Sequence, residues 1–343
     1  MFESIEIMAD DILKRGIQLG ASDIHILPRK EGPLVQFRID NHLVPQERLT
    51  FDETERLISH LKFLASMDIG EKRRPQNGAI TITLDGKVVG LRLSTLPTAY
   101  LESLVIRLIP QYNILPLEQL SLFPNTAHRL ISLLKHSHGM IIFTGPTGSG
   151  KTTTLYSLLH HTQELLNRNV ITLEDPIENQ SEKMLQVQIN EKAGITYAVG
   201  LKAALRHDPD VIMVGEIRDA ETARIAIRAS LTGHLILTTM HSRDAEGAIF
   251  RLLEFGISWF EIQQSLIAVT AKRLVELKGT FERNKRASVY ELLYGKELNK
   301  VLQAANGMQM KTCYRTLKNE LGKAVAMGFV EDKEYERLVY TDE

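Results

Sequence analysis

The sequence predicts two domains: a small α+β domain over residues 1–112 and an α/β domain with a mainly parallel sheet over residues 121–343. A length of 343 residues suits two domains. In the first part, apolar residues change from helical spacing to strict alternation, as they do where helices pack on a half-buried sheet. In the second part, strand, loop and helix repeat, which indicates parallel strands covered on both faces. Residues 113–120, near Pro110 and Pro116, are expected to form a linker.

The small domain begins with a predicted helix and continues as strands. Ile5, Met8 and Ile12 recur at helical spacing, and Gly20 closes the pattern. Asp85-Gly86 separates two alternating segments and is a strong hairpin signal. The elements expected after the first helix are strands over 22–26, 34–40, 79–84, 87–94 and 104–109 and a helix over 51–68.

Short apolar runs alternate with predicted helices in the α/β domain. We expect strands over 140–144, 170–173, 211–214 and 235–239, and helices over 152–166, 197–206 and 220–230. The strands are apolar at nearly every position, as expected for a sheet that is buried on both faces. Beyond Ala245 the pattern is mostly helical, so we expect the domain to end in a helical part.

Composition excludes several classes of protein. The net charge of −1 gives no basic footprint, so no direct nucleic-acid binding is expected. The single cysteine, Cys313, excludes a disulfide framework and any zinc site built on paired cysteines, so no zinc is expected. No apolar run approaches the length of a membrane span, and the acidic N-terminal residues lack the basic start of a signal peptide. The sequence predicts a cytoplasmic protein that can still dock on a membrane partner.

Residues 145–152 are the most informative segment, because they match G-x-x-x-x-G-K-[ST] at every position. An apolar strand precedes them and a helix follows, so backbone N–H groups and a helix N-terminus converge on one anion. Lys151 is expected to reach the β- and γ-phosphates of ATP, and the Thr152 hydroxyl to bind Mg²⁺. A chance glycine-rich loop is the alternative. The residues expected to bind ATP are Gly145, Pro146, Thr147, Gly148, Ser149, Gly150, Lys151, Thr152 and Thr153.

Acidic residues follow two of the predicted strands. Glu216 comes after the apolar run 211–214, the position of a Walker B carboxylate that acts on Mg²⁺ or its waters. Glu174 ends the preceding strand and is the candidate general base for the attacking water, while Asp175 is expected to help hold the water or the metal. An ordinary surface glutamate at 216 and a solvated acidic turn at 174–178 are the alternatives.

Two histidines, His234 and His241, bracket the expected strand 235–239. Their spacing places them at opposite ends of a strand, which is not a metal-ligand arrangement. Taken alone, each is more often structural than catalytic. Close to a triphosphate, either is a candidate sensor of the γ-phosphate.

These motifs together resemble the secretion ATPase superfamily, the motors of type II secretion and of type IV pilus assembly. Four signatures stand in the family order: the phosphate loop, an acidic box over 171–178, a Walker B segment over 211–219 and a histidine box over 232–241. The Walker B segment ends in Gly-Glu-Ile-Arg-Asp, which is specific to the family. Residues 20–25 and 37–40 match its N-terminal domain, and the resemblance covers about residues 15–295.

The resemblance implies a PAS-like N-terminal domain and a RecA-like P-loop NTPase domain in a homohexameric ring. It implies that ATP hydrolysis moves the domains, and that this motion drives pilin subunits from the membrane into a filament. It also implies a polytopic platform protein of the inner membrane as the partner, and a peripheral position on the inner face of the membrane. By the same match, Glu174 is the catalytic glutamate and Glu216 the Walker B acid.

The branch is indicated by residues 73–78, 92–98 and 101–107, which look like those of assembly motors. Most assembly motors carry a further N-terminal domain and a four-cysteine zinc module, and we expect neither in this protein. This compact form is most similar to the motors of competence pseudopili in Gram-positive bacteria, which implies DNA uptake. The alternatives are motors of type II secretion, of pilus assembly or of pilus retraction. A nucleotide-binding scaffold and a small-molecule phosphotransferase belong to other classes, and the intact catalytic set disfavours the scaffold.

Arginines complete the expected site. Arg92 and Arg107 lie on strands that the family places near the nucleotide, where cations from a mobile domain couple hydrolysis to closure. Arg206 and Arg218 flank the Walker B strand and are candidates from the second domain. For each arginine, an ordinary surface or ion-pair role is the alternative.

Overall fold

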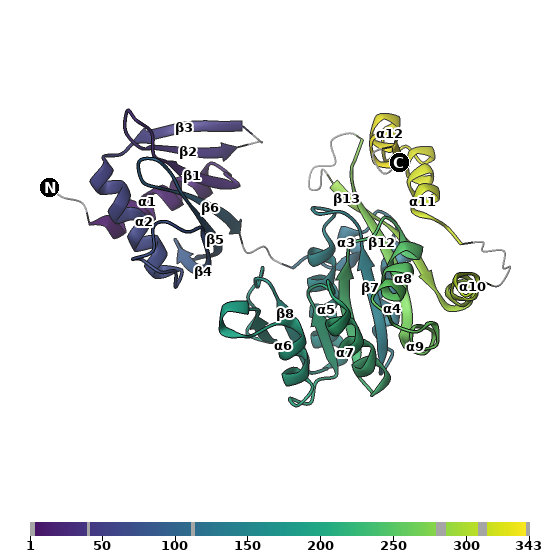
Figure 1. Ribbon diagram of the computed structural model, residues 1–343. Coiled ribbons are helices and arrows are strands. Elements are labelled where there is room, and N and C mark those ends of the chain that lie inside the picture. The colour runs from purple at the N-terminus through teal and green to yellow at the C-terminus, as the bar shows by residue number, and fades with distance from the viewer. Residues whose placement is uncertain (1–3, 40–41, 111–113, 279–285, 308–313, 341–343) are drawn as a thin grey trace. The chain divides into compact units, whose positions relative to one another are not determined.

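The computed structural model describes residues 4–39, 42–110, 114–278, 286–307 and 314–340. Cys313 and Asp40 therefore lie outside the described residues. The chain forms two compact units, the first comprising Met1–Tyr112 with Glu178–Gln180 and the second Asn113–Ile177 with Ser181–Glu343 (Figure 1). Among the described residues, none of the helices combines the length and the apolar character needed to cross a bilayer.

The first unit is a six-stranded antiparallel sheet with two helices. Its strand order is β3-β2-β1-β6-β5-β4. The elements are α1 (Ile5–Gln18), β1 (Asp23–Leu27), β2 (Leu34–Ile39), β3 (His42–Arg48), α2 (Phe51–Leu64), β4 (Gln76–Leu84), β5 (Lys87–Pro97) and β6 (Glu102–Pro110). Ser4 caps α1, and Thr50 with Glu53 forms a capping box at α2. Both helices share one apolar core with the sheet, in which Ile24 and Ile26 are fully buried.

The second unit is built on a seven-stranded sheet of order β13-β12-β7-β11-β10-β8-β9. Its strands are β7 (Gly139–Thr144), β8 (Val170–Glu174), β9 (Leu185–Gln188), β10 (Val211–Val214), β11 (Leu235–Met240), β12 (Leu266–Glu276) and β13 (Arg286–Tyr294). Its helices are α3 (Leu117–Leu120), α4 (Pro124–Leu133), α5 (Lys151–Leu166), α6 (Tyr197–Ala204), α7 (Ala220–Leu231), α8 (Ala245–Glu254), α9 (Trp259–Ser265), α10 (Gly295–Ala305), α11 (Leu317–Ala326) and α12 (Asp332–Tyr340). All neighbouring strands are parallel except β12 and β13.

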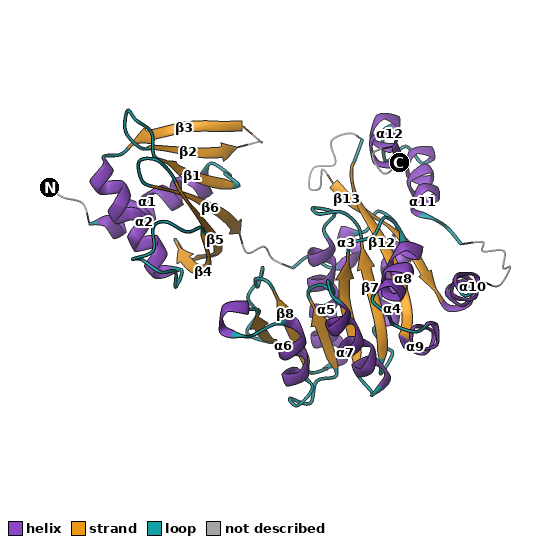
Figure 2. Cartoon of the chain, in the orientation of Figure 1, coloured by secondary structure: helices purple, strands orange, loops and turns teal. Residues whose placement is uncertain are grey.

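Helices cover both faces of this sheet (Figure 2). Ile141 and Phe143 of β7 face a core shared with α3, α4 and α5. Met140 and Ile142 face the opposite core, which is shared with α6 to α10. The two cores explain why β7 is apolar at every central position. Helices α11 and α12 form a smaller cluster against the ends of β12 and β13, around Val275 and Val289.

The predicted elements are confirmed in place, with small differences at their ends, but strands β3, β9, β12 and β13 and helices α3 and α4 were not predicted. Strands β12 and β13 interrupt the region beyond Ala245 that we expected to be mostly helical. Strand β12 is buried along almost its whole length, so it shows no alternation, and Lys272 and Arg273 break its apolar run. Strand β3 is largely exposed and contains Pro45, as an edge strand can. Helix α3 lies within the expected linker, and Leu117 is buried in the core beside α5.

Candidate active site

The phosphate loop joins the carboxyl end of β7 to the start of α5, at the edge of the sheet where ligand sites of α/β folds lie. The loop requires glycine at two positions. Gly145 has a φ of +143°, and a Cβ there would stand 2.6 Å from the carbonyl oxygen of Lys272. Gly150 has a φ of +79° and is the N-cap of α5 without a side-chain hydrogen bond. The first N–H groups of α5 therefore face the loop, which favours a bound anion.

The side chain of Lys151 curls back into the loop. Its Nζ donates hydrogen bonds to the carbonyl oxygens of Gly145 (2.7 Å) and Pro146 (3.0 Å). Burial lowers the pKa of Lys151, the charge of Arg273 lowers it further, and Glu216 opposes both. The ammonium group thus lies among the groups that are expected to bind phosphate, with a carboxylate nearby.

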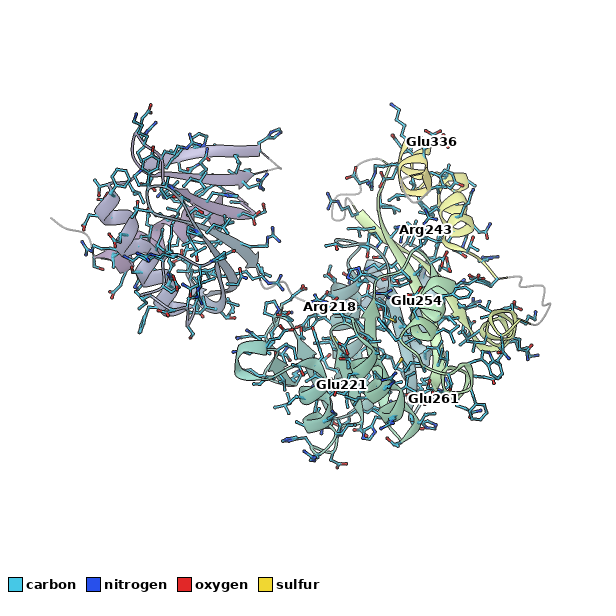
Figure 3. The ribbon with its side chains drawn as sticks, viewed as in Figure 1. Arg218, Glu221, Arg243, Glu254, Glu261 and Glu336 are labelled. Carbon is cyan, nitrogen blue, oxygen red and sulfur yellow. The ribbon has the colours of Figure 1, made fainter. Side chains whose placement is uncertain are left out.

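Glu216 and His241 follow neighbouring strands and meet at the same edge. Glu216 forms an ion pair with Arg218, and His241 Nε2 lies 3.7 Å from Glu216 Oε2. Burial lowers the pKa of His241, as do Lys151 and Arg218, while Glu216 opposes the shift. His241 is therefore neutral at pH 7 and can donate or accept a hydrogen bond there. Figure 3 shows Arg218 and Arg243 near the carboxyl ends of the strands, and Glu261 toward the other end.

Glu174 is the last residue of β8 and is only 3% exposed. Among the contacts described, three side chains donate hydrogen bonds to it: Tyr156 to Oε2 at 2.6 Å, Thr172 to Oε1 at 2.6 Å and Gln186 to Oε1 at 3.3 Å. These contacts fix the direction of the carboxylate, as a general base requires. Leu173 of β8 pairs with Val214 of β10. Glu174 comes one residue after Leu173 and Glu216 two residues after Val214, so both glutamates lie at the carboxyl ends of neighbouring strands.

Tyr197, the first residue of α6, lies among these acids. A Cβ on Gly215 would stand 2.9 Å from its hydroxyl oxygen. Burial raises the pKa of the Tyr197 phenol, and the charges of Glu216, Asp175 and Glu174 add to the effect. The phenol thus stays protonated and can donate a hydrogen bond among the carboxylates. Asp175 itself is exposed just beyond β8.

A cavity of about 300 Å³ opens beside the phosphate loop. Arg273, Arg286 and Arg337 bring three cations from β12, β13 and α12 to its wall. Arg286 lies 3.7 Å from Glu276, and Arg337 donates to Glu334 at 2.8 Å. The residues that line it are Pro146, Thr147, Gly148, Ser149, Arg273, Leu274, Glu276, Arg286, Arg337 and Leu338. The loop therefore borders a surface that suits an anionic ligand.

Residues 2–337 match the model of the Type II/IV secretion system protein family. The chain belongs to this family. Competence protein ComGA of Bacillus subtilis (strain 168) is 54% identical, over 98% of this chain and 99% of that protein. Type II secretion system protein E of Aeromonas hydrophila is 46% identical over 77% of this chain, which spans about half of that protein's length (53%). The crystal structure of the pilus retraction motor PilT with bound ADP is 27% identical, with a TM-score of 0.77 and 96% of both chains covered.

The second unit has the RecA-like fold of P-loop ATPases, and with its intact phosphate loop this secretion protein is an ATP hydrolase. The oxygen donors at the loop fit Mg²⁺, which in such sites takes one or two protein carboxylates or hydroxyls together with phosphate oxygens and water. Thr152, Glu216 and Asp175 stay the predicted ligands. The PAS-like assignment of the first unit also stays a prediction.

His234 lies at the other edge of the sheet in this secretion ATPase. Its carbonyl oxygen accepts a hydrogen bond from the N–H of Gly139, the first residue of β7, and its Nδ1 lies 3.2 Å from the carbonyl oxygen of Ala229. The phosphate loop follows the last residue of β7, one strand length away. The structure therefore brings His241 to the loop of its own chain and does not bring His234 there.

Arg92 and Arg107 pair across β5 and β6 in the first unit. Arg107 Nε donates a 2.8 Å hydrogen bond to Asp23 Oδ1. The desolvated Asp23 carboxyl keeps a pKa below its usual range because Arg107 and Ser22 donate to it. The reach of both arginines to a nucleotide stays a prediction, whereas Arg218 lies at the site and Arg206 is exposed beyond α6.

The sequence analysis did not identify the residues that support the catalytic groups and the phosphate loop. Tyr156 and Tyr197 are aromatic hydroxyls within helices, and Lys272 lies within an unpredicted strand. A usable signal existed for Tyr156, which follows Lys151 by five residues on the helix that the motif itself predicts. Tyr197 and Lys272 carry no motif, and only the fold places them near the loop.

Proposed function

We propose that this chain is the ATPase that powers assembly of a competence pseudopilus for DNA uptake. The observation that carries the proposal is the similarity to ComGA, which extends over nearly the full length of both chains. The catalytic set agrees with it, because Lys151, Glu174 and Glu216 come together at one edge of the sheet. A scaffold that only binds nucleotide has no need of a desolvated glutamate held by three donors.

The chain's own residues supply positioning and charge for hydrolysis of the γ-phosphate. The loop N–H groups and Lys151 hold the phosphates, while Thr152, Glu216 and Asp175 hold Mg²⁺, which neutralises developing charge when bound. Glu174 takes the proton of the attacking water, and its three donors fix the direction of the carboxylate. Neutral His241, close to Lys151 and Glu216, senses the γ-phosphate.

The proposal extends to the wider assembly that the family resemblance implies. The motor works as a homohexamer without zinc, on the cytoplasmic face of the membrane, against a polytopic platform protein, and it has no direct contact with DNA. Arg92 and Arg107 bring charge from the first unit, which is PAS-like in this proposal, so that hydrolysis is coupled to domain motion. A net charge of −1 supports the absence of DNA contact.

A second candidate is a motor for type II secretion or for type IV pilus assembly or retraction. The similarity to type II secretion system protein E of Aeromonas hydrophila and to the retraction motor PilT favours it. The assembly-type residues 73–78 argue against retraction.

The test combines turnover with a phenotype in the bacterium that carries this chain. ATP hydrolysis and solution mass are measured for the purified full chain and for Glu174→Gln. A deletion strain is then complemented with each, and DNA uptake, surface filaments and secreted proteins are scored together. Loss of DNA uptake that only the active chain restores supports the proposal. Normal DNA uptake in the deletion strain overturns it, and a secretion defect or over-long filaments would select the second candidate.

A further inference from the structure

Lys272 on β12 lies beneath the phosphate loop and is only 1% exposed. Its Nζ donates a 2.5 Å hydrogen bond to the carbonyl oxygen of Gly150 and a 2.6 Å hydrogen bond to Thr154 Oγ1. These two acceptors flank Lys151 along the chain. One ammonium group thus joins the end of the phosphate loop to the first turn of α5.

The neighbouring strand completes the enclosure. Tyr290 of β13 pairs with Lys272 in register, and Lys272 Nζ lies 5.4 Å from the centroid of its ring. The Tyr290 hydroxyl lies 2.8 Å from Thr154 Oγ1. Lys272, Thr154 and Tyr290 therefore form one connected cluster under the loop, made from β12, α5 and β13.

Two glycines of the phosphate-loop motif face Lys272. A Cβ on Gly150 would stand 2.9 Å from Lys272 Nζ, and one on Gly145 would stand 2.6 Å from the Lys272 carbonyl oxygen. The backbone and the side chain of this residue thus occupy the space that larger residues in the loop would need. The two glycines of the motif therefore allow the loop to pack closely against β12.

Burial of the Lys272 ammonium group lowers the stability of the folded chain. Its two hydrogen-bond acceptors are neutral oxygens, and burial together with the charge of Lys151 lowers the pKa of Lys272 to about 7. A methionine fills a similar volume without that desolvation cost. Residues that reduce stability are retained chiefly where function needs them.

The Gly150 carbonyl contact has a direct consequence for ligand binding. In a planar trans peptide, the C=O of Gly150 and the N–H of Lys151 point in opposite directions. Holding the carbonyl toward β12 therefore aims the Lys151 N–H into the loop, where the phosphates are expected. A positive charge behind the loop also attracts a polyphosphate.

We propose that Lys272 is a positioning residue of the phosphate loop, which holds Gly150 and Thr154 so that the loop N–H groups and Lys151 face the phosphates. The inference rests on the proposed function, since it requires that the loop binds ATP. The position of Lys272 in the buried cluster predicts that its substitution affects nucleotide binding rather than the chemical step.

The experiment measures KM and kcat for ATP with the full chain at pH 6.5 and pH 8.5. Loss of a charged hydrogen-bond donor in Lys272→Met should raise KM about tenfold and change kcat less than about twofold. The increase should be larger at pH 6.5, where the wild-type amine is charged; Lys151 of α5, Tyr290 of β13 and Arg273 of β12 are the titratable or charged groups around it. A purely structural role would not produce this pH dependence.

Thr270→Val is the matched control, because Thr270 is fully buried on the same strand and donates to the Glu291 carbonyl oxygen at 2.8 Å. It should lower the melting temperature and leave KM unchanged. Wild-type KM in Lys272→Met at both pH values overturns the inference, as does an equal rise in Thr270→Val. Should Lys272→Met not fold, Lys272→Gln decides, and a wild-type KM at both pH values overturns the inference. A wild-type chain that binds no ATP overturns the proposed function instead.

Discussion

The hydroxyl of Tyr156 donates a 2.6 Å hydrogen bond to Oε2 of Glu174. Tyr156 belongs to α5, the helix that begins at Lys151, whereas Glu174 ends β8. One helix therefore carries the lysine expected to bind phosphate and also holds the carboxylate expected to activate water. Movement of α5 on nucleotide binding would be transmitted to both groups at once.

Removal of the carboxylate should stop turnover and preserve binding. Glu174→Gln keeps the shape and the hydrogen-bond acceptor but cannot take a proton, so kcat should fall by roughly 10²–10⁴. The affinity for ATP should stay within about twofold. Single-turnover hydrolysis and equilibrium binding measure the two quantities, and undiminished kcat would move the role of base to Glu216.

Tyr156→Phe tests the contact itself. The ring and its packing stay, but one hydrogen bond to the carboxylate is lost, so kcat should fall about tenfold with little change in KM. A matched control is Tyr335→Phe, which packs in the α11–α12 cluster, is not among the residues that line the cavity beside the loop, and should leave kcat unchanged. If Tyr156→Phe hydrolyses ATP at the wild-type rate, the contact does not position the base.

Lys151→Ala should abolish tight nucleotide binding. The variant removes the cation of the phosphate loop, so the dissociation constant for ATP should rise about a hundredfold. Calorimetric titration of wild type and variant measures it. The folded structure should survive, because the Lys151 ammonium hydrogen-bonds only to the carbonyl oxygens of a surface loop in the contacts described. Unchanged affinity would contradict the assignment of residues 145–152.

The arginine pair of the first unit gives a separate prediction about turnover. Arg92→Ala or Arg107→Ala should lower kcat by roughly 10³-fold if these side chains act on the transferred phosphate. The melting temperature should change little for Arg92→Ala and should fall for Arg107→Ala, because the buried Asp23 carboxylate then loses its Arg107 donor. Arg48→Ala is the control, because Arg48 is also a half-exposed arginine of this unit and pairs with Glu31 at 3.5 Å. Full activity in both test variants would exclude the first unit from the catalytic site.

The pKa of Lys272 predicts how stability changes with pH. Its value of about 7 in the folded chain lies below the ordinary lysine value of about 10.4. Between these two pH values the unfolded chain binds a proton at Lys272 that the folded chain does not. The free energy of unfolding therefore increases as pH rises from 7 toward 10. Below pH 7 the desolvation cost is fully present. The gain in melting temperature from Lys272→Met should therefore be larger at pH 6.5 than at pH 9, and an equal gain at both would contradict it.

Much of the α/β unit could be predicted, because strands that are buried on both faces give unbroken apolar runs. The expected strand 211–214 agrees with β10 at every residue, and helices α5 and α7 differ by one residue at an end. The phosphate loop was placed by its motif alone. Strand β12 escaped prediction because its two adjacent cations, Lys272 and Arg273, are buried by contacts that only the folded chain supplies.

The histidines show a different limit. The sequence places His234 and His241 on either side of a strand, so only one can lie at a given edge of a parallel sheet. The phosphate loop follows β7, so the site lies at the carboxyl ends of the strands. The structure places His241 at that edge, beside Glu216. Tyr156, Tyr197 and Lys272 reach the site through packing between elements far apart in sequence, and no local pattern encodes that.

Strand β7, which carries the phosphate loop, is bordered on one side by β11 and on the other by β12. Residues 139–144 leave the ribosome more than 120 residues before 266–276, which supply one of these borders. During synthesis, the loop is therefore complete as a sequence long before the strand beneath it exists. A nascent chain that stops short of β12 has an unpaired strand edge beside its nucleotide loop, and we expect such a chain to bind ATP more weakly than the full chain does.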